Sequence, residues 1–201
     1  MAQTKEERPA CYCHVRALNL VEPRIALDVF FGGLMLANDI PYKHHGPYIR
    51  MKAGVLTSAA FFAHTDFRLF AHRRVTTQAK KAYTMIISGH ARKGAVWLVE
   101  DQEQDRPRAV RLVNAAPGVQ RAIMTVLGTK PEAAVYKEAT PYILWPQQDA
   151  NVVLRAQYAN ETMRVHIPER LMHTTGAHSV YLAGPPPTPP EALVLRDGPE
   201  Y

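Results

Sequence analysis

Residues 25–33 of this chain read Ile-Ala-Leu-Asp-Val-Phe-Phe-Gly-Gly, and this stretch decides the fold class. Every second residue is apolar: Ile25, Leu27, Val29 and Phe31. Alternation of this kind lays one apolar row along a single face of an extended strand. The following glycine pair suits a tight hairpin turn, and residues 34–37 then return as the second strand. The stretch therefore predicts a β-hairpin with one buried face.

Short apolar runs between turns continue through the first half of the chain. The other predicted strands are residues 12–20, 48–52, 56–63, 69–76, 82–88 and 95–100. About seven short strands with turns at this spacing are typical of an immunoglobulin-like antiparallel sandwich. Helices are the competing assignment for residues 56–63 and 116–127. The 16 prolines favour strands and turns, because proline blocks helix interiors.

The sequence also repeats itself at a shift of about 95 residues, the spacing of a small domain. The matching pairs are residues 15–19 and 110–114 (VRALN and VRLVN), Gly33 and Gly128, residues 47–49 and 141–143 (PYI in both), and residues 82–89 and 177–184 (AYTMIISG and AHSVYLAG). Because the matches keep one order at nearly one shift, they predict a duplicated module.

Duplication predicts an all-β protein of two tandem sandwich domains, at residues 11–101 and 108–197. The polar stretch 101–107 (DQEQDRP) is predicted to link them. In the second domain, residues 152–159 and 162–167 are predicted to form a hairpin around Asn160-Glu161. Trp97 and Trp145 are interpreted as packing residues.

Three side chains of metal-binding type lie close together near the N-terminus, namely Cys11, Cys13 and His14. Thiolate and imidazole are the ligands that zinc prefers, and His44 and His45 are further candidates. In a strand, alternation puts the two cysteines on one face and His14 on the other. A metal site at these residues, or a metal-dependent enzyme built on it, is one hypothesis for this chain.

Motifs of nucleophilic catalysis and nucleotide binding are absent from the sequence. The only serines, Ser58, Ser88 and Ser179, do not lie in G-x-S-x-G, and no phosphate-binding glycine motif occurs. Asp28 interrupts an apolar strand, and we interpret it as an acceptor for neighbouring backbone groups or for Asn19. We therefore expect a protein that is not an enzyme and uses no cofactor.

The chain carries 24 Lys and Arg against 18 Asp and Glu, a formal net charge of +6. This excess favours anionic partners without requiring one. Basic pairs occur at residues 73–74, 80–81 and 92–93, but without interleaved aromatics for base stacking, so nucleic acid is not expected as a partner. The proline tract 185–190 is predicted to be a stiffened loop. The polar residues 1–10 lack a signal peptide, and no apolar run predicts a membrane-spanning helix.

Residues 15–33, 48–54 and 82–84 resemble the DUF-4397 group of bacterial proteins, which are tandem immunoglobulin-like modules of unknown function. The most specific parts are Val15-Arg16, Leu27-Asp28-Val29 and Ala82-Tyr83-Thr84. The resemblance extends over both copies, from about Cys11 to Asp197. The chain also looks distantly similar to the periplasmic accessory protein of alginate acetylation.

This chain departs from the group where it has Asn19 in place of His, and Val21-Glu22 in place of Ser-Pro. In the second copy, Ile123 and His178 replace Asp28 and Tyr83, so a site built on those side chains is expected at most once. The resemblance supplies no catalytic residues.

Taken together, these features predict a non-catalytic structural or ligand-binding protein. The resemblance implies association with the cell envelope or surface, with a polysaccharide or another envelope protein as partner. An accessory subunit of exopolysaccharide modification is the remaining alternative. Open sheet edges make a homo-oligomer possible.

Overall fold

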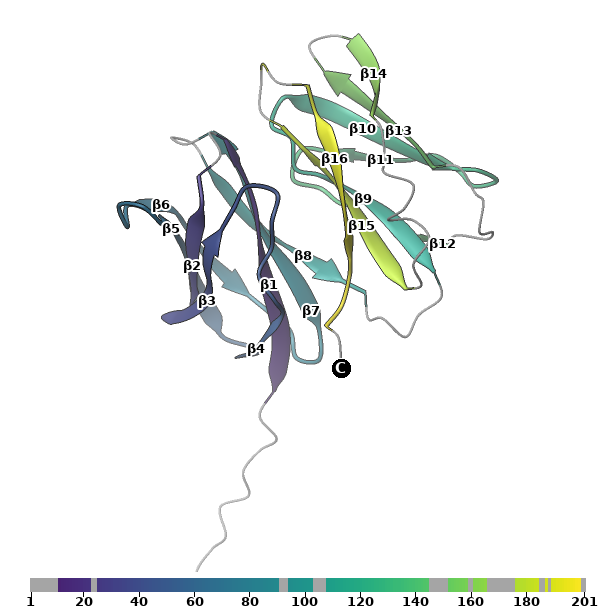
Figure 1. Ribbon diagram of the computed structural model, residues 1–201. Coiled ribbons are helices and arrows are strands. Elements are labelled where there is room, and N and C mark those ends of the chain that lie inside the picture. The colour runs from purple at the N-terminus through teal and green to yellow at the C-terminus, as the bar shows by residue number, and fades with distance from the viewer. Residues whose placement is uncertain are drawn as a thin grey trace, which may run out of the picture.

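The computed structural model describes residues 11–22, 25–90, 94–102, 108–144, 152–158, 161–165, 176–184, 187 and 189–199. All regular structure in this part of the chain is β-strand, and the strands form two sandwiches that lie side by side (Figure 1). The predicted all-β fold of two sandwich units is confirmed. Helices as the alternative for residues 56–63 and 116–127 are wrong, because residues 56–63 form strand β5 and residues 119–126 form strand β10.

The first module consists of two four-stranded sheets. Its strands are β1 (Tyr12–Glu22), β2 (Leu27–Phe31), β3 (Leu34–Ile40), β4 (Ile49–Lys52), β5 (Leu56–Ala63), β6 (Leu69–Thr76), β7 (Ala82–His90) and β8 (Ala95–Asp101). Sheet A has the order β4-β1-β7-β8, and sheet B has the order β3-β2-β5-β6. In sheet A, β1 and β7 are parallel, while the other neighbours are antiparallel.

The second module repeats this arrangement strand for strand. Its strands are β9 (Ala109–Asn114), β10 (Val119–Val126), β11 (Glu132–Val135), β12 (Ile143–Leu144), β13 (Val152–Tyr158), β14 (Glu161–Val165), β15 (Ala177–Ala183) and β16 (Glu191–Arg196). Sheet C has the order β12-β9-β15-β16, and sheet D has the order β11-β10-β13-β14. Each strand of the first module thus has a counterpart eight places later, as duplication predicts.

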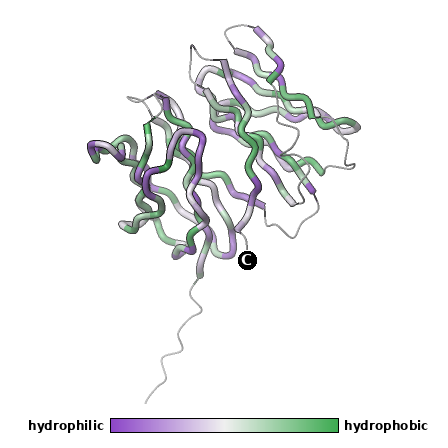
Figure 2. Tube along the Cα trace, viewed as in Figure 1, coloured by the Kyte–Doolittle hydropathy of each residue, from purple (hydrophilic) through white to green (hydrophobic). Residues whose placement is uncertain are grey.

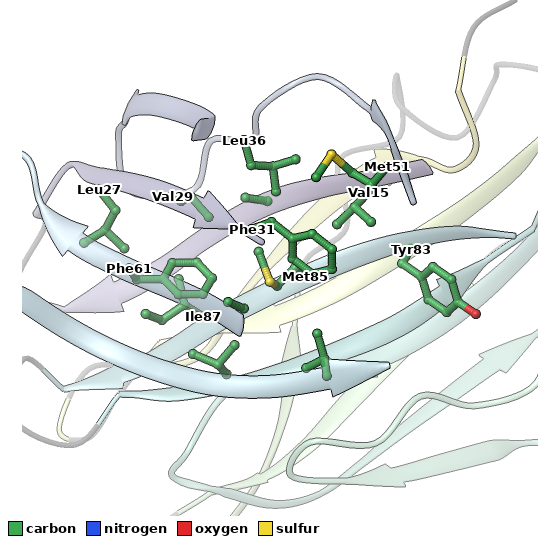
Figure 3. Close-up of a cluster of buried hydrophobic side chains, with 14 of the residues drawn as sticks. Val15, Leu27, Val29, Phe31, Leu36, Met51, Phe61, Tyr83, Met85 and Ile87 are labelled. Carbon is green, nitrogen blue, oxygen red and sulfur yellow. The ribbon is translucent and has the colours of Figure 1, made fainter. Parts of the chain in front are cut away.

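The predicted hairpin of residues 25–37 is formed by β2 and β3. Gly32 and Gly33 have φ angles of 62° and 81°. Two successive positive φ angles match the turn whose twist suits a β-hairpin, and glycine adopts them without steric cost. Leu27, Val29 and Phe31 point into the core between sheets A and B, where Phe61, Met85 and Ile87 meet them (Figure 3).

Strand β7 is buried on both faces from Ala82 to Gly89, including the polar Thr84 and Ser88. Figure 2 shows hydrophobic and hydrophilic stretches alternating along the strands of both modules. One face, with Met85 and Ile87, belongs to the core of the first module. The opposite face, with Ile86, belongs to an apolar layer between sheets A and C. The buried residues of that layer are Leu18, Leu20, Ile86, Trp97, Val99, Val113, Ala115, Tyr181 and Ala183.

One predicted turn is displaced by one residue, and several other predictions concern residues outside the part of the chain that the structure describes. Glu161 pairs with Tyr158 in the β13–β14 hairpin, so the predicted turn at Asn160-Glu161 was one residue too late. Trp97 is a packing residue of the layer between the modules, as predicted. Trp145, residues 92–93, residues 1–10 and most of the linker lie outside the described residues, and the domain boundaries stay predictions.

Candidate functional site

The most extensive polar cluster lies buried between the two modules. Alternation along β1 turns Val15 and Ala17 into the core and leaves Arg16 on the face toward the second module. Arg16 Nε donates to Thr84 Oγ1 at 2.8 Å. Its Nη1 donates to the carbonyl of Arg196 at 2.7 Å, and its Nη2 donates to Asp197 Oδ1 at 3.0 Å. The guanidinium thus spans the boundary between the modules.

Arg111 of β9 makes the same contacts in the opposite direction. Its Nε donates to Ser179 Oγ at 2.7 Å, and its Nη2 donates to Asp101 Oδ1 at 2.6 Å. Its Nη1 donates to the carbonyl of Glu100. Each arginine therefore binds a hydroxyl of its own module and the carboxylate and backbone of the other. A pseudo-two-fold axis relates the two halves of this cluster.

Two tyrosines complete the cluster with the same symmetry. Tyr48 donates to Asp101 Oδ2, and Tyr142 donates to Asp197 Oδ2, both at 2.7 Å. In return, Tyr48 Oη accepts from the Gly198 amide at 3.1 Å. The Arg16 guanidinium lies 4.6 Å from the centre of the Tyr48 ring, a favourable cation–π distance.

Burial raises the pKa of Asp197 to about 6, with a contribution from the nearby Asp101 carboxylate, and the two guanidiniums oppose that rise. Burial also lowers the pKa of Arg111, but the surrounding carboxylates and tyrosines raise it by more, so the net pKa is above its ordinary value. Arg16, Arg111 and both carboxylates have side chains that are at most 4% exposed. The cluster is closed to ligands and holds the two modules together. We name it the lock; its residues are Arg16, Tyr48, Thr84, Asp101, Arg111, Tyr142, Ser179 and Asp197.

Only the two arginines of the lock could be recognised from the sequence. Arg16 and Arg111 stand at the same place in the repeated VRALN and VRLVN segments. Asp101, which falls in both the predicted first domain and the predicted linker, is the last residue of β8, and its side chain is buried. Ser179, considered above as a nucleophile, donates to Asp197 Oδ2 inside the lock.

A second polar group lies on the outer face of sheet B. Asp28 Oδ1 accepts from the Asp39 amide at 2.8 Å and from His64 Nδ1 at 2.9 Å. The predicted role of Asp28 as an acceptor for backbone groups is confirmed. Asn19 as its partner is wrong: Asn19 Nδ2 donates instead to the carbonyls of Ile25 and Ile40, at 2.7 and 2.9 Å.

His64 forms the solvent-accessible part of this group. Its side chain is 39% exposed, whereas that of Asp28 is 5% exposed. The hydrogen bond to Asp28 raises the pKa of His64, desolvation opposes this rise, and the charges of Asp28 and Asp39 add to it. The Asp39 Oδ1 atom lies 4.0 Å from His64 Nε2.

Three phenylalanine rings lie beside this polar group. Phe62 and Phe67 stack with their centroids 4.8 Å apart and an interplanar angle of 11°. Phe30 meets both rings edge-on, at 5.5 and 5.9 Å. Phe67 is 55% exposed and has a φ angle of 51°. A bulky residue in the left-handed region is strained, so the surrounding turn must hold it there.

A pocket of about 420 Å³ adjoins the polar group. Its lining residues are Ala26, Pro41, Tyr42, Lys43 and His44. The carbonyl of Ala26 accepts from the His64 amide at 3.0 Å, which ties the pocket to the polar group. Strand alternation puts Asp28 and Phe30 on the outer face of β2, and Ala26 of the pocket wall directly precedes this strand. We name the pocket, Asp28, Asp39, His64 and the three rings the β2 face.

The described strands of the second module do not repeat the β2 face. Strand β10 is the counterpart of β2, and it has Ile123 and Thr125 where β2 has Asp28 and Phe30. The expectation that such a site occurs at most once agrees with this arrangement. The aromatic rings were missed from the sequence, because their contact depends on the turn that holds Phe67.

The predicted metal ligands do not converge. Cys11 is exposed, while Cys13 is buried with its Sγ 3.2 Å from Thr77 Oγ1. His14 lies on the opposite side of β1 from Cys13 and is half-buried. Within the described residues, no group of three or more His, Cys, Asp or Glu side chains could hold a metal ion. Metal binding at Cys11, Cys13 and His14 stays a prediction.

Two residues of the predicted basic pairs, Arg73 and Lys81, contact the sandwich surface. Arg73 Nη1 donates to the Val96 carbonyl at 2.6 Å, and Lys81 pairs with Glu100.

Ser88 is buried and lies 3.2 Å from the hydroxyl of Tyr136, a residue of the second module. These contacts give Ser88 a packing role between modules.

Comparison with known proteins places the chain in a family. A family model described as "Domain of unknown function (DUF4397)" matches residues 13–125, which span the first module and strands β9 and β10. The chain therefore belongs to the DUF4397 family. No curated protein matches, and the similarity to the alginate-acetylation accessory protein is not shown.

Among solved structures, the chain is similar to the carbohydrate-binding module CBMbc (family CBM26) of Eubacterium rectale Amy13K in complex with maltoheptaose. The identity is 10%, the TM-score is 0.29, and the match covers 94% of this chain and 98% of that chain. A likeness at this TM-score carries no argument about function. In the part of the chain that the structure describes, no helix has the length and apolarity to cross a membrane.

Proposed function

We propose that this protein is a non-catalytic carbohydrate-binding protein and that the β2 face is its ligand surface. The observation that carries the proposal is Phe67, an exposed ring held in a strained backbone conformation against Phe62. Strain of this kind persists where the surrounding structure enforces it, and it clusters at ligand sites. Folding gains little from an aromatic ring that is 55% exposed.

The chemistry of the β2 face fits a sugar. A pyranose has an apolar C–H face that packs on aromatic rings and a rim of hydroxyls that need hydrogen-bond partners. Phe67 and Phe30 supply the apolar surface, while His64 and Asp39 supply exposed polar groups beside it. The adjoining pocket includes Tyr42 and Lys43, and the Lys43 ammonium is paired with Glu191 of the second module.

An array of neutral oligosaccharides tests this proposal with three proteins. These are the full chain, the Phe67→Ala variant, and a Leu144→Ala control that removes a similarly exposed apolar side chain from the second module. We expect the full chain and the control to bind at least one glycan, with Phe67→Ala about tenfold weaker, since loss of one stacking contact costs about 1–3 kcal/mol. Absence of any neutral glycan ligand, or equal binding by Phe67→Ala, would contradict the proposal.

The other functions stay predictions. Envelope association and a role as accessory subunit rest on the family resemblance. A metal-dependent enzyme would need Cys13 to leave the core of the first module, where it is 0% exposed.

A further inference from the structure

The outer face of sheet D carries three exposed arginines. Strand alternation turns Leu154 and Ala156 of β13 into the core, which leaves Arg155 on the outer face. Arg121 of β10 and Arg164 of β14 share this face and are exposed. Three neighbouring strands therefore each contribute one guanidinium to the same surface, which we name the arginine face.

The strand register brings these arginines together. Arg155 and Arg164 are direct cross-strand partners, and Arg121 is opposite Gln157, two residues along β13 from Arg155. Side chains directly opposite each other have Cβ atoms about 5 Å apart, and diagonal neighbours lie about 7–8 Å apart. Like charges at these separations repel, so the face is destabilising unless an anion occupies it.

No acidic side chain relieves this repulsion within the described residues. None of their ion pairs includes Arg121, Arg155 or Arg164. The acids of the same sheet, Glu132 and Glu161, pair with Met124 and Tyr158, which belong to the inward-facing rows. Glu132 and Glu161 therefore belong to the inward-facing rows of sheet D, whereas the three arginines belong to the outward-facing rows.

The first module has different chemistry at the same places. In sheet B, Asp28 pairs with Phe62 and Phe62 pairs with Leu69; in sheet D, Ile123 pairs with Arg155 and Arg155 pairs with Arg164. By this register, Arg155 and Arg164 stand where sheet B has Phe62 and Leu69. The two modules therefore present the same surface with an aromatic character in one and a cationic character in the other.

We propose that the arginine face binds an acidic polysaccharide through its carboxylate groups. Guanidinium groups pair with carboxylates through two parallel hydrogen bonds. Gln157 and Thr162, which are exposed on the same face and pair with each other, supply partners for sugar hydroxyls. Along the described outer rows of β10, β13 and β14 there is no aromatic ring, so the base stacking that single-stranded nucleic acids use is lacking.

Calorimetric titration of the full chain with polygalacturonate tests this proposal, with dextran as the neutral polymer. The test variant is Arg155→Gln/Arg164→Gln. The matched control, Arg68→Gln/Arg74→Gln, removes the same charge from exposed positions of the first module. We expect the test variant to lose at least tenfold in affinity and to show a weaker salt dependence, because fewer counterions are released. The control is expected to change less than twofold, and dextran is expected not to bind.

Three results would overturn the proposal. The first is that the wild type fails to bind polygalacturonate. The second is that the control loses as much affinity as the test variant, which would make net charge the cause. The third is that a single-stranded oligodeoxynucleotide of equal charge binds more tightly, which would make nucleic acid the occupant. Phe67→Ala is expected to keep polygalacturonate binding, so failure at the β2 face and failure at the arginine face can be told apart.

Discussion

The Nη2 atom of Arg16 lies 3.0 Å from Asp197 Oδ1, although 181 residues separate the two along the chain. The reciprocal pair of Arg111 with Asp101 lies at 2.6 Å. A buried ion pair is weak support for stability by itself, because desolvation offsets much of the attraction. Its geometry is exacting, however, since each guanidinium must meet a hydroxyl, a carbonyl and a carboxylate together. The crossed pairs therefore fix how the modules sit against each other.

Replacing Arg16 with Met is expected to destabilise the protein by about 3–5 kcal/mol, because Asp197 would stay buried with one of its charge partners missing. Arg111→Met should have a similar effect, since its contacts are the pseudo-symmetric copy. Denaturant unfolding at neutral pH measures both. Arg121→Met, at an exposed position, should stay within about 0.5 kcal/mol of the wild type. A loss below 1 kcal/mol for both buried variants would show that the lock contributes little.

Tyr48→Phe and Tyr142→Phe should each lower the free energy of unfolding by about 1–3 kcal/mol, because each removes a hydroxyl that donates to a buried carboxylate and accepts from a backbone amide. Equal effects are expected, since Tyr142 accepts from the Gln102 amide as Tyr48 does from Gly198. Chemical denaturation of the two variants side by side makes the comparison. A neutral effect in one and a large effect in the other would disprove the pseudo-symmetry of the lock.

Asn19→Ala should cost about 2 kcal/mol or more, because the Ile25 and Ile40 carbonyls would lose their donor. Ile25 precedes β2 and Ile40 ends β3, and each is followed by a residue of the pocket wall, Ala26 and Pro41. The exposed Asn38 provides the control, and Asn38→Ala is expected to be nearly neutral. Thermal unfolding followed by circular dichroism distinguishes the two. Similar melting temperatures for both variants would remove Asn19 from this role.

The His64–Asp28 pair predicts a pH dependence with a definite sign. Because the pKa of His64 is raised in the folded state, its contribution to stability is present below the unfolded pKa near 6.5 and is lost as pH rises through the higher folded value. The melting temperature of the wild type relative to His64→Gln should therefore be higher at pH 5.5 than at pH 8.5. An NMR titration should place the His64 pKa above 6.5, and a lower value would contradict the assignment.

Local patterns were enough to predict the strands and the duplication. Alternation over residues 25–31 and the glycine pair after it specify the β2–β3 hairpin, because side-chain period and turn geometry are local properties. The lock was only half visible: the repeat contains Arg16 and Arg111, but their partners stand on the other module.

Both candidate surfaces depend on features that the sequence does not signal. Phe67 adopts a left-handed conformation that local signals would assign to glycine, so the ring stack on Phe62 could not be foreseen. The pairing of Arg155 with Arg164 depends on the register of the β13–β14 hairpin. With the turn placed at Asn160-Glu161, Arg164 falls opposite Gln157, so the direct pairing of Arg155 with Arg164 is lost although both stay on one face.

Differential scanning calorimetry of the full chain tests most directly whether the lock joins the two sandwiches into one cooperative unit. The account predicts a single transition whose calorimetric enthalpy equals the van't Hoff enthalpy, and a split into two transitions in the Arg16→Met/Arg111→Met variant. Two separate transitions in the wild type would show that the modules unfold independently and would contradict the account.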